Sequence, residues 1–151
     1  MKIDIINKKI LFLLQKDARM TYKEIATELK RSETTIRDRI KALERVGIIQ
    51  GYTALIDKTI LGLNFFAMIF ANPVSSNELD SITEEIKNVK NVLRVYQISG
   101  HHRIAIFMVA PSYKELKEII KSQLLPLGLK DEEIVSVLEA DREFISPLEI
   151  P

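Results

Sequence analysis

Residues able to bind a polyanion are concentrated between positions 31 and 45 of the sequence. The cations among them are Arg31, Arg37, Arg39, Lys41 and Arg45. Guanidinium and ammonium groups form charge-assisted hydrogen bonds with phosphate and carboxylate oxygens. The other interpretation is a solvated helix surface, in which Lys41 and Arg45 pair with the nearby carboxylates of Asp38 and Glu44. The place of these residues in the fold must decide between the two.

A second cluster of polar residues lies between two apolar runs of the chain. It comprises Ser99, Gly100, His101, His102 and Arg103. An arginine in such a turn favours a bidentate pair with a carboxylate and repels an ammonium group. Histidines are common metal ligands, but adjacent residues of a strand point to opposite faces, and the chain has only these two histidines. We therefore expect no metal site at this turn.

The sequence has no arrangement typical of an enzyme. It contains no glycine-rich phosphate loop and no nucleophile motif, and acidic pairs such as Glu84 and Glu85 carry no sign of burial. The absence of cysteine excludes disulfides, thiolate metal sites and thiol nucleophiles. We therefore expect a protein that is not an enzyme and needs no cofactor.

The net charge of +1 hides an asymmetry along the chain. Residues 1–60 carry 13 Lys and Arg against 8 Asp and Glu, whereas residues 61–151 carry 9 against 13. This asymmetry indicates that the first part faces a polyanion. No run of about 18 apolar residues occurs, and charged residues interrupt the N-terminal segment, so we expect a cytoplasmic protein without a membrane span or signal peptide.

Three short helices are predicted to position the cationic residues. Asp4 is an acceptable N-cap for the first helix. Thr21 and Glu24 form a capping box at the start of the second, in which each side chain accepts a hydrogen bond from an exposed backbone N–H. Ser32 caps the third helix, and Gly47 is a fitting stop for it.

The third predicted helix has an apolar side and a polar side. Its apolar stripe is Ile36, Ile40, Leu43 and Val46, with Thr34, Asp38, Lys41 and Arg45 near the opposite side and Thr35, Arg37 and Arg39 on the flanks. Only Lys30 and Arg31 join this helix to the preceding one, so the two should cross steeply as a helix-turn-helix from Tyr22 to Lys41. That geometry lets the N-terminal half of the third helix enter a major groove of DNA.

The rest of the chain reads as strands and amphipathic helices in alternation. Strands are predicted at 63–71, 92–99, 103–110 and 133–138, with Asn72 and Pro73 breaking the first, and helices begin at Ser75 or Ser76 and at Ser112. This βαββαβ order is ferredoxin-like, one antiparallel sheet with both helices on one face. An additional strand or small wing is predicted from Ile48 to Ile56, so the fold class is α+β with an N-terminal winged helix-turn-helix.

The sheet face without helices is expected to be apolar. Its candidate residues are Phe66, Met68, Phe70, Ile104, Ile106 and Met108. An exposed apolar face of this kind needs a partner. A second copy of the chain is the economical partner, which predicts a homodimer.

Several stretches of residues 3–62 share one family pattern. They include DAR at 17–19, EIA at 24–26, SETTIRDRIKALE at 32–44, GIIQGYTALID at 47–57 and LG at 61–62. With them the segment resembles the DNA-binding half of the Lrp/AsnC, or leucine-responsive, transcription regulators. The resemblance implies that the third helix reads DNA in the major groove and that the protein forms a homodimer, which assembles further to a tetramer or octamer. It also implies a second domain regulated by a small molecule.

The sequence departs from the family pattern at two turns. Many members have a glycine and then an apolar residue where this chain has Lys30 and Arg31. In the family a turn of the form G-x-x-D closes part of an amino-acid effector site between subunits, and here the turn that begins at Gly100 ends in Arg103. Three alternatives follow: an effector bound mainly through carboxylates, an effector bound elsewhere, or no effector.

These expectations converge on a sequence-specific DNA-binding transcription regulator of amino-acid or related metabolism. The expected domains are a helix-turn-helix at 1–50, a linker strand at 51–62 and a ferredoxin-like dimerisation and ligand-binding domain at 63–151. Base contacts are expected from Thr34, Thr35, Arg37 and Asp38, and phosphate contacts from Arg31, Arg39, Lys41 and Arg45. The alternative is a DNA-architectural protein of the same fold that responds to no ligand.

Overall fold

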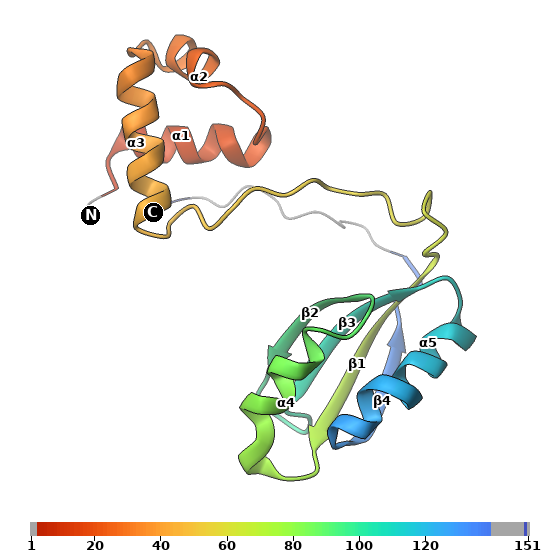
Figure 1. Ribbon diagram of the computed structural model, residues 1–151. Coiled ribbons are helices and arrows are strands. Elements are labelled where there is room, and N and C mark those ends of the chain that lie inside the picture. The colour runs from red at the N-terminus through yellow and green to blue at the C-terminus, as the bar shows by residue number, and fades with distance from the viewer. Residues whose placement is uncertain (1–2, 140–149, 151) are drawn as a thin grey trace. The chain divides into compact units, whose positions relative to one another are not determined.

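The computed structural model describes residues 3–139 and residue 150. The chain divides into two compact units with the boundary between Leu55 and Ile56, which falls inside the expected linker at 51–62. One unit is helical and the other is built on a sheet (Figure 1). Residues 140–149 and 151 of the expected second domain lie outside the described residues. No helix in the described part of the chain is long and apolar enough to cross a membrane.

The first unit contains three helices whose starts follow the predicted caps. They are α1 (Ile5–Lys16), α2 (Tyr22–Leu29) and α3 (Glu33–Arg45). Asp4, Thr21 and Ser32 each accept a hydrogen bond from the backbone N–H three residues ahead, and Glu24 completes the capping box. Because each cap satisfies backbone donors that the first helical turn leaves without a partner, it fixes where the helix begins.

The apolar sides of the three helices meet in one core. Its fully buried residues include Ile10, Ile25, Ile36 and Leu43. The predicted stripe of α3 is therefore confirmed, except at its end. Val46 is 53% exposed because it follows the last helical residue as the C-cap and does not continue the buried face.

The segment after α3 contains no strand among its described residues, so the predicted strand from Ile48 to Ile56 is wrong. Its composition suits a strand, but an extended segment needs a neighbouring strand to complete the hydrogen-bond ladder. The segment is held by a side chain instead: the Tyr52 hydroxyl donates a hydrogen bond of 2.9 Å to Oε1 of Glu44 in α3. Partial burial and the Glu44 carboxylate raise the pKa of Tyr52 to about 12.

The second unit is a four-stranded antiparallel sheet with both helices on one face (Figure 1). Its strands are β1 (Phe65–Pro73), β2 (Val92–Gln97), β3 (Ile104–Ala110) and β4 (Leu129–Ser136), in the spatial order β2-β3-β1-β4. Helix α4 (Leu79–Ile86) follows β1 through a 3₁₀ turn, and α5 (Tyr113–Ile119) follows β3 and continues as a short π-helix and a 3₁₀ turn. The βαββαβ arrangement and the α+β class are thus confirmed.

Several predicted strand boundaries differ from the structure, and two of the differences are connected. Strand β1 does not break before Asn72 but continues through Pro73, and β4 begins at Leu129 instead of Glu133. The two errors have one cause, because the extension of β1 pairs with the extension of β4, with Asn72 opposite Lys130. A proline at the end of a strand does not interrupt the preceding ladder, because only its own N–H is missing.

A β-bulge lies inside this paired extension. The register between β1 and β4 shifts between Phe70 and Asn72, and Asp131 of β4 has a left-handed φ of 54°. A bulge places two residues of one strand opposite one residue of the other and redirects the side chains there. It therefore decides which side chains of β4 lie near the end of β1.

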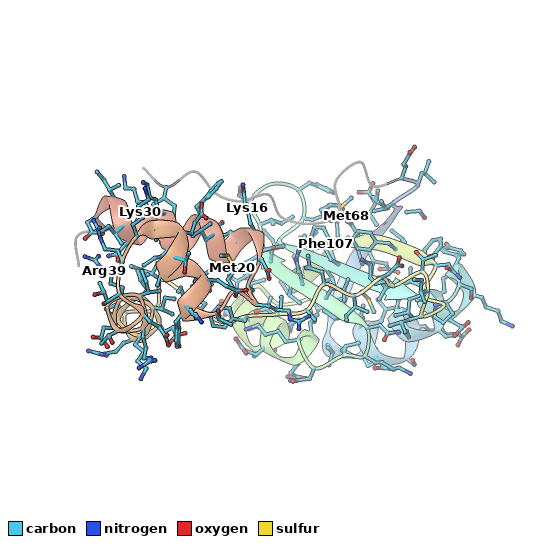
Figure 2. The ribbon with its side chains drawn as sticks, turned by 90° about the horizontal axis from the view of Figure 1, so that it is seen from above. Lys16, Met20, Lys30, Arg39, Met68 and Phe107 are labelled. Carbon is cyan, nitrogen blue, oxygen red and sulfur yellow. The ribbon has the colours of Figure 1, made fainter. Side chains whose placement is uncertain are left out.

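The open face of the sheet was predicted only in part. Phe66, Met68 and Phe70 lie on it, as expected, because the alternate residues of β1 are buried under the helices. The placement of Ile104, Ile106 and Met108 on this face is wrong, since all three are fully buried in the helix-covered core. Met68 pairs with Phe107, so Phe107 lies on the open face and the adjacent Ile106 and Met108 do not (Figure 2). A one-residue change of register exchanges the two faces of a strand, and the sequence alone did not settle it.

Candidate nucleic-acid interface and ligand turn

The turn between α2 and α3 has lysine at a position that usually holds glycine. Lys30 has a φ of 52°, its N–H donates to the Thr27 carbonyl (3.3 Å), and the Arg31 N–H donates to the Ala26 carbonyl (2.9 Å). These paired bonds are the Schellman motif that ends many helices. A left-handed lysine costs about 1 kcal/mol relative to glycine. Lys30, labelled in Figure 2, also places an exposed cation next to the start of α3.

The outer side of α3 is exposed where the spacing predicted. Thr34, Asp38, Lys41 and Arg45 are all exposed. In the described part of the chain, Lys41 and Arg45 form no ion pair with Asp38 or Glu44, so the partners required by the solvated-surface interpretation are absent. The Arg31 guanidinium donates to the Lys30 carbonyl (3.0 Å) and stays at the turn. The outer side of α3 therefore offers charges that remain available to an anion.

Arg37 is held on the flank of α3 by two neighbours. Its Nη2 donates to Oε1 of Glu33 at 2.9 Å, and its guanidinium lies 5.6 Å from the centre of the Tyr22 ring. The side chain is half-buried. These contacts limit the conformations of the guanidinium, which reduces the entropy lost when it binds a planar hydrogen-bonding partner.

The two threonines at the start of α3 differ in what their hydroxyls already bind. The Thr35 hydroxyl lies 2.7 Å from the Ser32 hydroxyl, and the Thr35 N–H donates to the same oxygen. The Thr34 hydroxyl has no hydrogen-bond partner among the described residues and is exposed. Thr34 is therefore the better candidate for a contact with a base edge.

Arg39 joins α3 to the start of α1. Its Nη1 donates to Oδ2 of Asp4 (2.7 Å) and to Oδ1 of Asn7 (2.9 Å). The Asn7 backbone N–H, followed by the Arg39 side chain, holds the pKa of Asp4 below its usual value. Only 29% of the Arg39 side chain is exposed. Its first role is therefore to brace the helices, and any phosphate contact comes in addition.

The turn from Ser99 to Arg103 is organised by a residue that the sequence did not single out. The Asn72 Oδ1 accepts a hydrogen bond from the Arg103 N–H (3.0 Å), and its Nδ2 donates to the His101 carbonyl (3.3 Å). Asn72 was expected to break a strand. Asn72 lies two residues after Phe70, and alternate residues of a strand lie on the same face. This spacing could have identified Asn72 as a residue of the open face.

Asp131 is the second residue that the sequence did not identify. Its Oδ2 lies 3.5 Å from the Asn72 Nδ2, although 59 residues separate them in the chain. The His102 ring lies 6.0 Å from the Phe70 ring and 4.8 Å from the His101 ring, both as aromatic contacts. The described residues contain no group of three or more histidines and carboxylates placed to hold a metal ion. The turn thus combines one cation, one nearby carboxylate and an amide.

Two family models match the chain in sequence order. A model described as winged helix-turn-helix DNA-binding matches residues 3–50. A model described as Lrp/AsnC ligand binding domain matches residues 64–140. The first covers α1 to α3, and the second covers the sheet unit.

Similar proteins cover nearly the whole chain. The HTH-type transcriptional regulator LrpA of Pyrococcus horikoshii is 37% identical over 122 residues, which is 81% of this chain and 86% of that protein. An uncharacterised HTH-type transcriptional regulator of Pyrococcus furiosus is 33% identical over 143 residues, 95% of this chain and 96% of that protein. A solved transcriptional regulator of Neisseria meningitidis, in complex with L-Met, has a TM-score of 0.88 at 21% identity, covering 98% of this chain and 97% of its own. The last match shows a shared fold.

Proposed function

Because the chain belongs to the Lrp/AsnC family of DNA-binding transcription regulators, we propose that it controls genes of amino-acid or related metabolism from defined operators. One observation carries the proposal: α3 exposes Thr34, Lys41 and Arg45 on a helix whose other side is buried, and the two cations have no ion pair among the described residues. Such a helix fits a major groove, where base edges display a distinct pattern of donors and acceptors. The cytoplasm is the compartment in which we expect it to act.

The side chains of α3 divide into two groups by what they can reach. We assign base edges to Thr34, Thr35, Arg37 and Asp38, which lie in the N-terminal half of the helix. We assign phosphates to Arg31, Arg39, Lys41 and Arg45. Phosphate contacts position a protein on the duplex, whereas contacts with base edges carry the sequence information.

The open face of the sheet supports the proposal of a homodimer. Phe107 contacts Tyr96 edge to face at 5.7 Å between ring centres, and it lies 6.3 Å from Phe66. Tyr96 remains 49% exposed. A continuous aromatic surface on one sheet face loses its contact with water when a second copy packs against it. Such a dimer, alone or within a tetramer or octamer, would set the spacing of two copies of α3.

The sheet unit is also proposed to bind the effector. The matched family model describes a ligand-binding domain, and the regulator from Neisseria meningitidis is a complex with L-Met. In this chain the turn from Ser99 to Arg103 is held in place by the Asn72 amide. We therefore propose an amino acid or another small carboxylate as the effector.

Selection of bound genomic DNA fragments, with and without a mixture of metabolites, tests the whole proposal. The expected result is a shared, roughly palindromic motif whose half-sites lie about one helical turn, or a multiple of it, apart. A change in the selected set when metabolites are added would support an effector. Fragments with no common motif, retained only according to salt concentration, would instead indicate a DNA-architectural protein.

A further inference from the structure

Two residues without an assigned contact to DNA lie against Arg37. Oε1 of Glu33 accepts a hydrogen bond of 2.9 Å from the Arg37 Nη2, and the centre of the Tyr22 ring lies 5.6 Å from the guanidinium carbon. Glu33 is the first residue of α3, one helical turn before Arg37, whereas Tyr22 is the first residue of α2. Both helices of the helix-turn-helix therefore contact the same guanidinium.

The Tyr22 ring is held in place by the start of α2. Thr21 and Glu24 form the capping box of this helix, which fixes the backbone on either side of Tyr22. The ring itself is half-buried and packs against the helical core. A cation near the face of an aromatic ring is attracted by it. The position of the Arg37 guanidinium is therefore tied to the fold of the whole unit as well as to its own helix.

Glu33 changes the charge of the site as well as its geometry. Its carboxylate lies in the first turn of α3, where the helix dipole favours a negative group. The ion pair of Glu33 and Arg37 has no net charge, so it attracts a phosphate less than an unpaired cation does. Hydrogen bonds from the guanidinium to neutral acceptors remain possible. The ion pair therefore favours a base edge over the DNA backbone.

The guanidinium keeps hydrogen-bond donors for a base. Glu33 occupies one N–H of Nη2, and a guanidinium has further N–H groups on Nη1, Nη2 and Nε. In the major groove, guanine places two acceptors, O6 and N7, side by side, whereas adenine places a donor beside its acceptor. A planar group that only donates, and whose orientation is restrained, therefore selects guanine.

We propose that Tyr22 and Glu33 are positioning residues that set Arg37 to read a guanine. On binding, Arg37 donates two parallel hydrogen bonds to O6 and N7, while Glu33 keeps its N–H of Nη2. The Tyr22 ring limits the movement of the guanidinium during this contact. The inference rests on the proposed sequence-specific function, and it names the base that is read and two further residues on which the reading depends.

Binding to operator variants tests the base. The motif that the full-length protein selects from genomic fragments is varied one base pair at a time, and fluorescence anisotropy gives the affinity for each DNA. Arg37→Ala identifies the base pair that Arg37 reads, because the preference at that pair disappears in this variant. We expect guanine at this pair in the wild-type motif. Another base there, or no pair that responds to Arg37→Ala, would overturn the proposal.

Substitutions of Tyr22 test its positioning role. Tyr22→Leu should lower the preference for guanine at that pair about threefold and leave the other positions unchanged, whereas Tyr22→Phe keeps the ring and should keep the preference. Combined with Arg37→Ala, Tyr22→Leu should not weaken operator binding further, because it acts through Arg37. A loss of preference at every position, or a further loss in the double variant, would overturn this role.

The charge of Glu33 gives two effects of opposite sign. Glu33→Gln should lower the preference for guanine about threefold, yet bind unrelated DNA more tightly at low salt, because Arg37 is then no longer neutralised. Glu28→Gln is the matched control, since Glu28 is an exposed carboxylate of α2 without an ion pair among the described residues. It should keep the wild-type preference. Equal loss of preference in both variants, or weaker binding of Glu33→Gln to unrelated DNA, would overturn the role of Glu33.

The wild-type selection separates this inference from the function on which it rests. A shared motif without guanine at the pair read by Arg37 would overturn the guanine contact and leave the proposed regulator intact. Failure of the wild type to select any shared motif would instead refute the sequence-specific function itself.

Discussion

At the scale of single residues, the lysine at position 30 lowers stability relative to glycine but adds a positive charge to the turn. Its left-handed conformation is required by the Schellman bonds that end α2, and no side-chain contact offsets its cost among the described residues. Lys30→Gly should therefore raise the free energy of unfolding by about 1 kcal/mol. Thermal unfolding measures this change.

A matched substitution checks that the effect comes from the left-handed position. Lys9 is an exposed lysine inside α1, so Lys9→Gly places glycine in a right-handed helix. It should lower the free energy of unfolding by about 1 kcal/mol. If the two substitutions shift stability in the same direction, the explanation by backbone conformation is incorrect.

The pair of Asp4 and Arg39 predicts a dependence of stability on pH. Because the pKa of Asp4 is lower in the folded chain than its usual value of 3.8, the carboxylate stabilises the fold above that value. The contribution is lost as the pH falls through the folded pKa. Asp4→Asn keeps a good N-cap but removes the charge, so its stability should change less between pH 6 and about pH 3.

Urea unfolding at several pH values measures this difference. Asp38→Asn is the control, since Asp38 is an exposed carboxylate of α3 with no partner among the described residues. This control should keep the pH profile of the wild type. A profile for Asp4→Asn that matches the wild type would contradict the role assigned to the ion pair.

At the scale of elements, the assignment of α3 residues to phosphates and to base edges predicts two different effects of substitution on DNA binding. Arg45→Ala, at the C-terminal end of the helix, should weaken binding to all sequences about equally and reduce the salt slope by about one. Arg37→Ala should instead reduce the preference for the operator over unrelated DNA, by about 1–3 kcal/mol. Titrations of both DNA types at several salt concentrations measure the two effects. An equal loss of preference in both variants would refute the division of α3.

The elements that could be predicted from the sequence are those determined by residues that lie close together in the chain. The caps at Asp4, Thr21 and Ser32 act within one helical turn, and the structure has all of them. The strand predicted from Ile48 failed because strand composition does not supply a pairing partner. The residues of the open face were predicted correctly for β1 and incorrectly for β3. A shift of one residue in the register decides whether Ile106 or Phe107 lies on that face.

In the candidate sites, too, the features that could be predicted are those determined by residues close together in the chain. The outer side of α3 follows from helical spacing, so its exposed residues were identified correctly. The contact between Asn72 and Asp131 depends on a bulge and on 59 intervening residues, for which no local pattern exists. Arg39 was expected to contact phosphate, and its ion pair with Asp4 was not predicted, because α1 and α3 meet only in the folded unit.

At the scale of the whole molecule, the open sheet face predicts an effect on assembly. Phe107→Arg introduces a charge at the centre of the aromatic surface, so a homodimer formed through this face should dissociate at concentrations where the wild type is associated. Analytical ultracentrifugation measures the change.

The control for this experiment is Tyr113→Arg. Tyr113 is a 48% exposed aromatic residue of α5, on the helix-covered side of the sheet. This variant should associate like the wild type. Dissociation of both variants, or of neither, would indicate that the open sheet face is not the dimer interface.

The edge strand β4 has a consequence for solubility. Unpaired backbone groups along a sheet edge can recruit the edge of another sheet, and a chain of such contacts grows without limit into fibrils. Exposed charges at Lys130, Asp131, Glu132 and Glu133, together with the bulge, make this edge a poor template for an identical copy. A homodimer formed through the open face of the sheet would be a closed assembly, whereas the charges and the bulge disfavour polymerisation through this edge.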